Sequence, residues 1–335
     1  MRVFVTGGSG LVGSHVIQQL RARGDEVLAL ARTHRAAAAS GALGAIPLSG
    51  DAMDPAVLER GVMESDASVH AAAIVLSKAD WAHHHAANVV PTEVMARAAA
   101  RSKRRLVHVS SVAVYGRRTT YDGGPGSVTE DFGMDSPIFP GDHYARSKRE
   151  AEQAVWRVRD ELGLAAVCLR PNVIYGEGDR AFGVRVAASL RRGLAPLFGP
   201  GDNPMSIVYA GNVAAAVLAA LDRPAVTGAF NVTNDGVITQ RDFIRTFARG
   251  LGVTVCFVRI PLSVAWPCAK IADGAIRLVR PSAGMMVLKT AIQFLSAANP
   301  FVSTRAEREL GWKPLIGPPD TVLRTARWYR DAHAA

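Results

Sequence analysis

The stretch Thr6-Gly7-Gly8-Ser9-Gly10-Leu11-Val12-Gly13 decides the fold of this 335-residue chain. It follows a short apolar run at residues 2–6 and opens a segment whose apolar residues recur at helical spacing as far as residue 20. Glycines at positions 8, 10 and 13 permit a tight turn, let the backbone approach a pyrophosphate, and leave helix N–H groups facing it. The stretch therefore predicts a dinucleotide-binding turn between a strand and a helix. A glycine turn that binds no ligand is the alternative.

Short apolar runs and helical patterns alternate through the first half of the chain. The runs lie at residues 2–6, 26–31, 45–49, 67–72, 105–110 and 166–170, and two further helical patterns lie at 86–101 and 144–162. Such alternation is typical of βαβ units that build a parallel sheet covered by helices. It predicts an α/β fold in which residues 1–170 form a Rossmann-type, doubly wound dinucleotide-binding domain.

Proline and glycine interrupt the pattern from about residue 171 onward. This change favours a smaller substrate-binding lobe made of residues 171–205 and 229–335. A strand at 206–209 followed by a helix at 213–221 predicts that residues 206–228 return to the first domain and to its main sheet.

Cofactor choice depends on the end of the second predicted strand. NAD-preferring sites place an acidic residue there for the ribose 2′-hydroxyl, whereas this strand ends Leu28-Ala29-Leu30-Ala31-Arg32. Arg32, with Arg35 close behind, can neutralise a 2′-phosphate instead. The sequence therefore predicts NADP, with NAD as the alternative if both arginines are simply solvated.

The third predicted strand is followed directly by Asp51 and Ala52. This position places Asp51 at the adenine end of the expected cofactor, so we predict that both residues contact it. The other interpretation is that Asp51 and Asp54 cap the helix that comes next, because aspartate is a favoured N-cap residue.

A phenol and an ammonium group lie four residues apart in Tyr144-Ala145-Arg146-Ser147-Lys148. This spacing puts both on one face of a helix, where the positive charge lowers the cost of ionising the phenol. Ser110 and Ser111 end another strand, at the edge where open α/β sheets bind ligands. Together these residues predict a site that exchanges a proton with a substrate oxygen, with either serine as the hydroxyl that contacts that oxygen.

Over essentially its whole length the chain resembles the extended short-chain dehydrogenase/reductase family, of the NAD-dependent epimerase/dehydratase type. The resemblance rests on Thr6 to Gly13, Gly50-Asp51, His70-Ala71-Ala72-Ala73, Asn88, Ser110-Ser111-Val112-Ala113-Val114-Tyr115-Gly116, Tyr144 to Lys148 and Leu169-Arg170-Pro171-Asn172-Val173-Ile174-Tyr175-Gly176. It implies that Ser111 polarises a carbonyl, that Tyr144 is the general acid or base, and that Lys148 assists Tyr144 and binds the nicotinamide ribose.

The same resemblance implies further site residues. Asn88 would hold a structural water or a backbone segment near Lys148, and Ser110 is the competing assignment for the catalytic serine. The cofactor would also contact a set of residues after three of the strands, namely Ala71, Ala72, Ala73, Ser110, Pro171 and Val173.

Two positions distinguish branches of this family. Sugar-nucleotide epimerases and dehydratases tend to carry an Asn two residues before the later Tyr-Gly and an Arg before the next apolar strand. This chain has Val173 and the stretch Asn203-Pro204-Met205 there, and it resembles the 3β-hydroxysteroid dehydrogenase-like branch instead. The resemblance implies an NAD(P)-dependent oxidoreductase acting on a ketone or secondary alcohol of a hydrophobic steroid-, lipid- or polyketide-like molecule. A sugar-nucleotide epimerase or dehydratase and a non-catalytic NAD(P)-binding subunit are the alternatives.

Residues 261–296 contain two apolar segments expected to be helical. In the first, Lys270, Asp273, Arg277 and Arg280 recur at helical spacing on one face, with apolar residues on the rest. Such helices suit a substrate lid or a membrane surface, and packing onto the core or a homodimer partner is the alternative.

Composition excludes several other classes of protein. The net charge of +10 is scattered and accompanies no nucleic-acid-binding motif, so no nucleic-acid partner is predicted. Three widely spaced cysteines and a chain start that runs straight into the first strand favour a cytoplasmic protein, with peripheral contact at the inner face of a membrane left open. His83, His84 and His85 are consecutive and cannot all face one metal ion; we expect a solvated helix start and no metal site.

Overall fold

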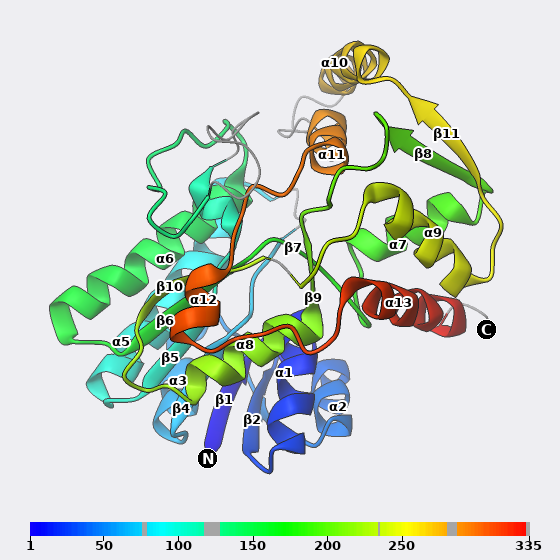
Figure 1. Cartoon of the computed structure of the whole chain (residues 1–335). Helices are drawn as coiled ribbons and strands as arrows, with labels where there is room; N and C mark the ends of the chain where they lie inside the picture. The colour runs from blue at the N-terminus through cyan, green and yellow to red at the C-terminus, as the bar shows by residue number, and fades with distance from the viewer. Residues whose placement is uncertain (76–78, 117–127, 234, 280–286, 333–335) are drawn as a thin grey trace.

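The computed structural model describes residues 1–75, 79–116, 128–233, 235–279 and 287–332, without the side chains of residue 273 and residues 275–291. Its centre is a seven-stranded sheet with the strand order β10-β6-β5-β4-β1-β2-β3 (Figure 1). Each neighbouring pair in it is parallel. The strands are β1 (Arg2–Thr6), β2 (Glu26–Ala31), β3 (Ile46–Ser49), β4 (Ala67–His70), β5 (Arg105–Val109), β6 (Ala166–Pro171) and β10 (Gly228–Val232). The predicted Rossmann-type α/β fold is confirmed.

Alternating side chains of the strands bury both faces of the sheet. On β1, Val3 and Val5 belong to the core under one layer of helices, while Phe4 between them belongs to the core on the opposite face. The first layer holds α1 (Leu11–Ala22), α8 (Ala210–Leu221) and α12 (Thr304–Glu309), and the second holds α3 (Pro55–Met63), α5 (Val90–Arg101) and α6 (His143–Leu162). The short helix α2 (His34–Ala42) contacts β2 and β3 at the edge.

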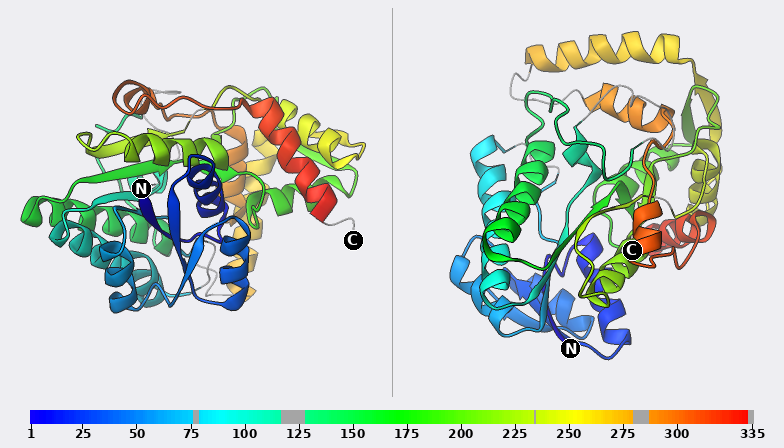
Figure 2. Two further views of the ribbon diagram at one scale, coloured as in Figure 1. Left: turned by 90° about the horizontal axis from the view of Figure 1, so that it is seen from below. Right: turned by 60° about the vertical axis from the view of Figure 1, so that its left-hand side comes forward.

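A second body of structure lies beside the carboxyl edge of the sheet (Figure 2). It contains two small parallel sheets, β7 (Val173–Tyr175) with β9 (Ile207–Tyr209) and β8 (Leu194–Phe198) with β11 (Cys256–Ile260). Its own core is formed by residues of these strands and of α7 (Phe182–Leu190), α9 (Gln240–Leu251) and α13 (Pro318–Ala332). Helices α10 (Leu262–Val279) and α11 (Val287–Ser296) follow β11. Within the described part of the chain no helix is long and apolar enough to cross a membrane.

One expectation about a single element was wrong, and another differs in detail. The strand expected at 206–209 does not join the main sheet: β9 pairs with β7, and β10 is the strand that adds to β6. An apolar run shows that a strand forms but not which strand it pairs with. The helix expected over residues 86–101 forms, but it begins earlier, with α4 (Trp81–His84), and continues through the π-helical turn His85–Val89 into α5. The division into domains at 170, 206–228 and 229–335 stays a prediction.

Candidate active site

The glycine turn between β1 and α1 is packed so closely that it has no room for side chains at Gly7 and Gly13. Gly7 has a positive φ of 73°, and a Cβ added at Gly13 would lie 2.1 Å from the carbonyl oxygen of Gly7. Helix α1 begins at Leu11 with no side-chain cap at Gly10 and no acidic residue in its first turn. Free N–H groups and the positive end of the helix dipole therefore face outward, which fits the pyrophosphate of a dinucleotide.

The chain after β4 lies directly against this turn. The backbone N–H of Ala71 donates to the carbonyl oxygen of Thr6 at 3.3 Å, and the N–H of Ala72 donates to the Thr6 hydroxyl at 3.4 Å. A Cβ at Gly7 would meet the backbone of both alanines within 3 Å. The structure thus brings the predicted residues Ala71 and Ala72 to the glycine turn, and Ala73 follows them.

Arg32 and Asp51 lie side by side at the ends of β2 and β3. The Arg32 guanidinium is 3.8 Å from the Asp51 carboxylate, and its side chain is 73% exposed. Asp54, and not Asp51, caps α3, because its carboxylate accepts the N–H of Ala56 at 3.0 Å. An exposed pair at this distance is weak. Arg32 is therefore available to an anionic group at this edge of the sheet.

Lys148 is the buried centre of the site. It lies one helical turn after Tyr144 on α6, is 3% exposed, and donates from Nζ to the carbonyl oxygen of Val109 at 2.7 Å. Val109 ends β5, so this bond holds the ammonium group beside the two serines that follow. Burial lowers the pKa of Lys148 to about 8.

The two serines have different partners. The Ser110 hydroxyl donates to the Glu152 carboxylate at 2.6 Å, and both side chains are buried. The Ser111 oxygen accepts the N–H of Ala113 at 3.2 Å, where a short 3-10 helix begins. Ser111 thereby keeps its own hydroxyl hydrogen for a substrate oxygen, whereas that of Ser110 is already used. The geometry favours Ser111 among the two predicted serines.

Asn88 joins the segment after Ala73 to α6. It lies in the π-helical turn, where its side-chain oxygen accepts the N–H of Ile74 at 2.8 Å. Its side-chain nitrogen donates to the carbonyl oxygen of Ile74 at 3.1 Å and to the Ser147 hydroxyl at 2.9 Å. Asn88 thus links the backbone at Ile74 to Ser147, the residue that precedes Lys148. π-helical turns are frequent at functional sites.

An ion-pair network that the sequence analysis missed lies beneath the serines. Arg170 pairs with Glu152 and donates to the Tyr115 hydroxyl at 2.7 Å, which in turn donates to Asn231 at 2.8 Å. Both charged side chains are at most 5% exposed. The overlooked signal is spacing, since Glu152 lies four residues after Lys148 and so on the same face of α6.

A row of buried side chains also crosses the sheet under Lys148. His70, His108 and Cys168 are register partners on β4, β5 and β6, and the two imidazole rings stack at 5.4 Å. Burial and the charge of Lys148 lower the pKa of His70 to about 3 and hold that of His108 well below its ordinary value. Both rings are thus neutral near pH 7, which leaves Lys148 as the positive charge beside them.

Apolar side chains occupy the positions that separate the branches of the family. Val173 on β7 is half-buried against the second core, and Met205 is 4% exposed within it. Pro171 ends β6 and is buried. The side chains at Asp273, Arg277 and Arg280 lie outside the described residues.

The expectation of a solvated helix start at His83 to His85 was wrong for one residue. His84 is 2% exposed, and its ring lies 5.9 Å from that of His143 on α6. Three consecutive histidines in a sequence look alike, and only the packing of α4 against α6 distinguishes the middle one.

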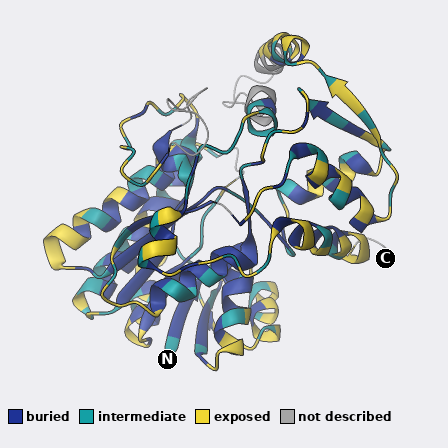
Figure 3. Cartoon of the chain, viewed as in Figure 1, coloured by how far each residue is buried: buried dark blue, intermediate teal, exposed yellow. Residues whose placement is uncertain are grey.

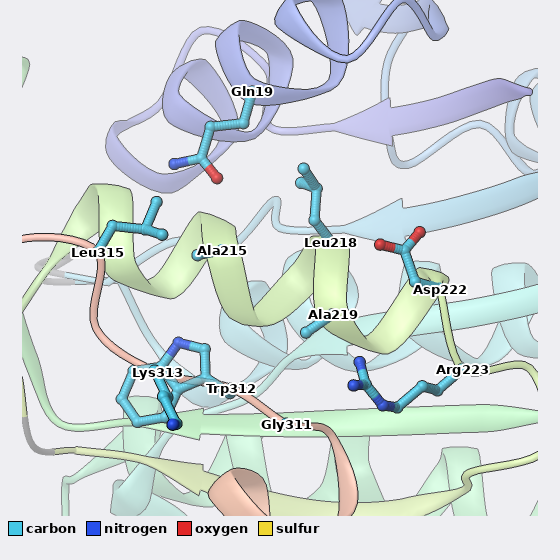
Figure 4. A pocket seen from close by; sticks show the side chains of 10 residues that line it. All are labelled: Gln19, Ala215, Leu218, Ala219, Asp222, Arg223, Gly311, Trp312, Lys313 and Leu315. Atoms are coloured by element: carbon cyan, nitrogen blue, oxygen red, sulfur yellow. The ribbon is translucent and has the colours of Figure 1, made fainter.

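A surface groove of about 380 Å³ lies away from these residues (Figure 4). It runs between α1, α8 and the chain before α13, and it is lined by Gln19, Ala215, Leu218, Ala219, Asp222, Arg223, Gly311, Trp312, Lys313 and Leu315. None of the predicted site residues lines it.

Comparisons with known proteins find similar sequences and a similar fold. Residues 3–234 match the model of the NAD dependent epimerase/dehydratase family. The chain is 32% identical over 315 residues to the 4-hydroxy-2-methyl-3-oxo-4-farnesyl-3,4-dihydroquinoline-1-oxide ketoreductase of Stigmatella aurantiaca, covering 93% of this chain and 92% of that protein. It is 28% identical over 236 residues to 3beta-hydroxysteroid-dehydrogenase/decarboxylase isoform 2 of Arabidopsis thaliana, covering 66% of this chain and 41% of that protein. The fold is similar to that of UDP-glucuronic acid 4-epimerase from Bacillus cereus in complex with NAD, with a TM-score of 0.75, 18% identity, and coverage of 100% of this chain and 98% of that one.

Proposed function

The chain belongs to the NAD dependent epimerase/dehydratase family of extended short-chain dehydrogenases/reductases, and from this premise we propose that it is an NADP-dependent reductase of a hydrophobic ketone. The observation that carries the proposal is the position of Lys148, whose buried ammonium group is held at the end of β5 by a 2.7 Å bond to Val109. That bond sets a positive charge one helical turn from Tyr144 and next to Ser111. Hydride transfer to a carbonyl needs a proton donor and a polarising group at the oxygen, and these residues supply both.

The reaction divides between the protein and its cofactor. The nicotinamide supplies the hydride when the dinucleotide is bound. Tyr144 gives the proton to the carbonyl oxygen, Ser111 donates a hydrogen bond to the same oxygen, and Lys148 stabilises the phenolate that remains. His70 and His108 are neutral near pH 7, so neither ring adds a second positive charge beside the Lys148 ammonium group. In the direction of alcohol oxidation the same groups act in reverse.

The hydrophobic substrate is supported by side chains and by relatives. Val173 and Met205 offer no charge or hydrogen bond to a sugar diphosphate. One relative is named as a ketoreductase of a farnesyl-bearing quinoline oxide and another as a 3β-hydroxysteroid dehydrogenase/decarboxylase. The test is a series of ketones that differ only in the length of their apolar chain, each assayed with NADPH. We expect kcat/KM to rise with apolar chain length; a preference for the shortest, most polar ketone would contradict the proposal.

NADP is preferred over NAD because Arg32 offers a cation to the 2′-phosphate. We expect Arg32→Asp to weaken NADP binding by about 10-fold to 100-fold, the value of a charge-assisted contact, while NAD binding changes little. Isothermal titration calorimetry measures both affinities.

The matched control for this variant is Arg249→Asp, which makes the same charge change at an exposed site on α9. Equal affinities of the parent protein for NADP and NAD would show that Arg32 does not recognise the 2′-phosphate. Equal losses of NADP affinity in the two variants would show the same.

The rate of ketone reduction depends on the proton of Lys148. Because burial lowers its pKa to about 8, Lys148 carries a positive charge below that pH and loses it above. We expect kcat/KM for reduction to fall as the pH rises through about 8. The measurement is a pH profile from 6 to about 10 with saturating cofactor.

Lys148→Arg separates this cause from ionisation of the substrate or of Tyr144, because arginine stays charged throughout the range. The kcat/KM of this variant, although lower than that of the parent protein, should not fall as the pH rises above 8. A falling limb that is unchanged in the variant would assign the titration to another group.

A further inference from the structure

A glutamate outside the proposed catalytic residues joins the cofactor helix to the second body of structure. Glu177 lies in the turn after β7, and its side chain is 18% exposed. Its contacts come from three elements that are distant from one another in the sequence: α1 through His15, β9 through Tyr209 and α13 through Arg324. Helix α1 follows the glycine turn directly, whereas β9 and α13 contribute to the core of the second body.

The turn that carries Glu177 is fixed on both sides. Before it, Gly176 lies so close to α8 that an added Cβ would meet that of Ala210 at 3.0 Å. After it, the N–H of Asp179 donates to the carbonyl oxygen of Gly176 at 3.2 Å. The Asp179 carboxylate in turn accepts backbone N–H groups at the start of α7. The backbone at Glu177 is therefore held in one place by the elements around it.

His15 contacts Glu177 from the cofactor helix. It lies one helical turn after Leu11, where α1 begins, and it is 6% exposed. Its Nε2 is 3.2 Å from the carbonyl oxygen of Glu177, which can only accept, so the ring carries a hydrogen on Nε2. Burial lowers the pKa of His15, and the ring is neutral near pH 7. The distance of 3.9 Å from Nε2 to the Glu177 carboxylate is thus a polar contact and not an ion pair.

The second body supplies the hydrogen bonds and the charge for this carboxylate. The Tyr209 hydroxyl donates to Oε2 of Glu177 at 2.7 Å, and burial raises the pKa of this phenol, so it keeps its hydrogen. Arg324 donates from Nε to the other carboxylate oxygen. The rings of Tyr209 and His15 also meet edge to face at 5.4 Å. Figure 3 shows β9, which ends at Tyr209, in the colour of buried residues.

We propose that Glu177 is a positioning residue for hydride transfer, which holds α1, and with it the dinucleotide, in a fixed relation to the second body. This inference rests on the proposed function and assigns the ketone to the second body. A pyrophosphate bound at the start of α1 determines where the nicotinamide lies. Hydride transfer needs the two reacting carbons about 3–3.5 Å apart, so the relation between α1 and the second body affects the rate.

Glu177→Ala removes the carboxylate that Tyr209 and Arg324 contact. We expect kcat for ketone reduction to fall by about 10-fold to 100-fold, because a misplacement of about 1 Å has an effect of this size. The Kd for NADP should stay within about threefold of the parental value, which separates misplacement of the cofactor from loss of its binding. Glu177→Gln keeps the length of the side chain and an accepting oxygen, and it should recover most of the rate. An unchanged kcat in Glu177→Ala would overturn the proposal.

The matched control is Glu93→Ala. Glu93 on α5 also pairs with arginines, at 2.9 Å from Arg97 and 3.8 Å from Arg157 on α6, but both of these helices cover the main sheet. We expect this variant to keep the parental kcat and the parental Kd for NADP. Equal losses of kcat in the two alanine variants would show a general effect of removing a glutamate, and would overturn the proposal.

A second measurement needs no ketone. Hydrogen–deuterium exchange with mass spectrometry compares the full chain without ligand and saturated with NADP or NAD. Because Glu177 would transmit the ordering of α1, we expect the dinucleotide to slow amide exchange in α13 by at least about threefold in the parent protein and in Glu93→Ala. In Glu177→Ala the exchange of α13 should not respond. Since no turnover is measured, this result does not depend on whether the protein reduces ketones. Equal slowing in the parent and in Glu177→Ala, or no slowing in the parent, would overturn the proposal.

Discussion

Replacing Tyr144 by phenylalanine is expected to lower kcat for ketone reduction by about 10²–10⁴-fold, because the variant has no proton to give to the carbonyl oxygen. Its ring still fills the same space at the start of α6, and Lys148 keeps its bond to Val109. NADP affinity and thermal stability should therefore stay close to those of the parent protein. Steady-state kinetics, calorimetry and thermal unfolding of the same preparation measure the three quantities.

The matched control for this change is Tyr175→Phe. It also removes a phenol hydroxyl, one that bonds to Thr321 at 2.6 Å in the core of the lobe and far along the chain from the serines. We expect this variant to lose some stability and to keep its kcat. A Tyr144→Phe protein that reduces ketones at the parental rate would show that another group supplies the proton.

Arg170→Met is expected to lower the free energy of unfolding by about 3–5 kcal/mol, the usual cost of leaving a buried charge without its partner. Glu152 is fully buried, and its carboxylate loses the one cation paired with it in the described structure. Ser110 and Trp156 still donate hydrogen bonds to Glu152 but carry no charge. Urea denaturation followed by circular dichroism measures the loss.

Arg245→Met serves as the control, because Arg245 pairs with Asp242 where both side chains are more than half exposed. Such surface pairs contribute about 0–1 kcal/mol. Adding Glu152→Gln to Arg170→Met should restore part of the stability, since no unpaired charge remains. If Arg170→Met loses no more free energy of unfolding than Arg245→Met, the Arg170–Glu152 pair does not stabilise the fold beneath the serines.

The part of the fold that follows from local spacing was predictable from the sequence. The strands and the glycine turn come from runs and repeats of a few residues, and the closeness of Tyr144 and Lys148 comes from one turn of helix. Six strands of the main sheet therefore formed as expected, with ends that differ by one or two residues. The seventh strand, β10, was not anticipated, and the run at 206–209 pairs with β7 instead of joining this sheet.

Features that depend on contacts between distant segments were not predictable in this way. Alignment of His70, His108 and Cys168 requires the register of three strands that are separated by 38 and 60 residues. Nothing local distinguishes Arg170 as the partner of Glu152 from the other arginines of the chain. The pairing of β9 with β7 has the same origin, because a three-residue apolar run fits more than one neighbour.

The central claim is that free NADPH reduces a ketone at the site formed by Ser111, Tyr144 and Lys148. The family model that matches this chain is that of epimerases and dehydratases, so the rival reaction is one in which the nicotinamide is reduced and reoxidised within a turnover. The direct test is the stoichiometry of cofactor consumption, measured with purified protein on long-chain ketones and on sugar nucleotides. The account predicts one NADPH oxidised for each ketone reduced, and no change in the sugar nucleotides. Conversion of a sugar nucleotide with no net loss of cofactor, and no ketone reduced, would contradict it.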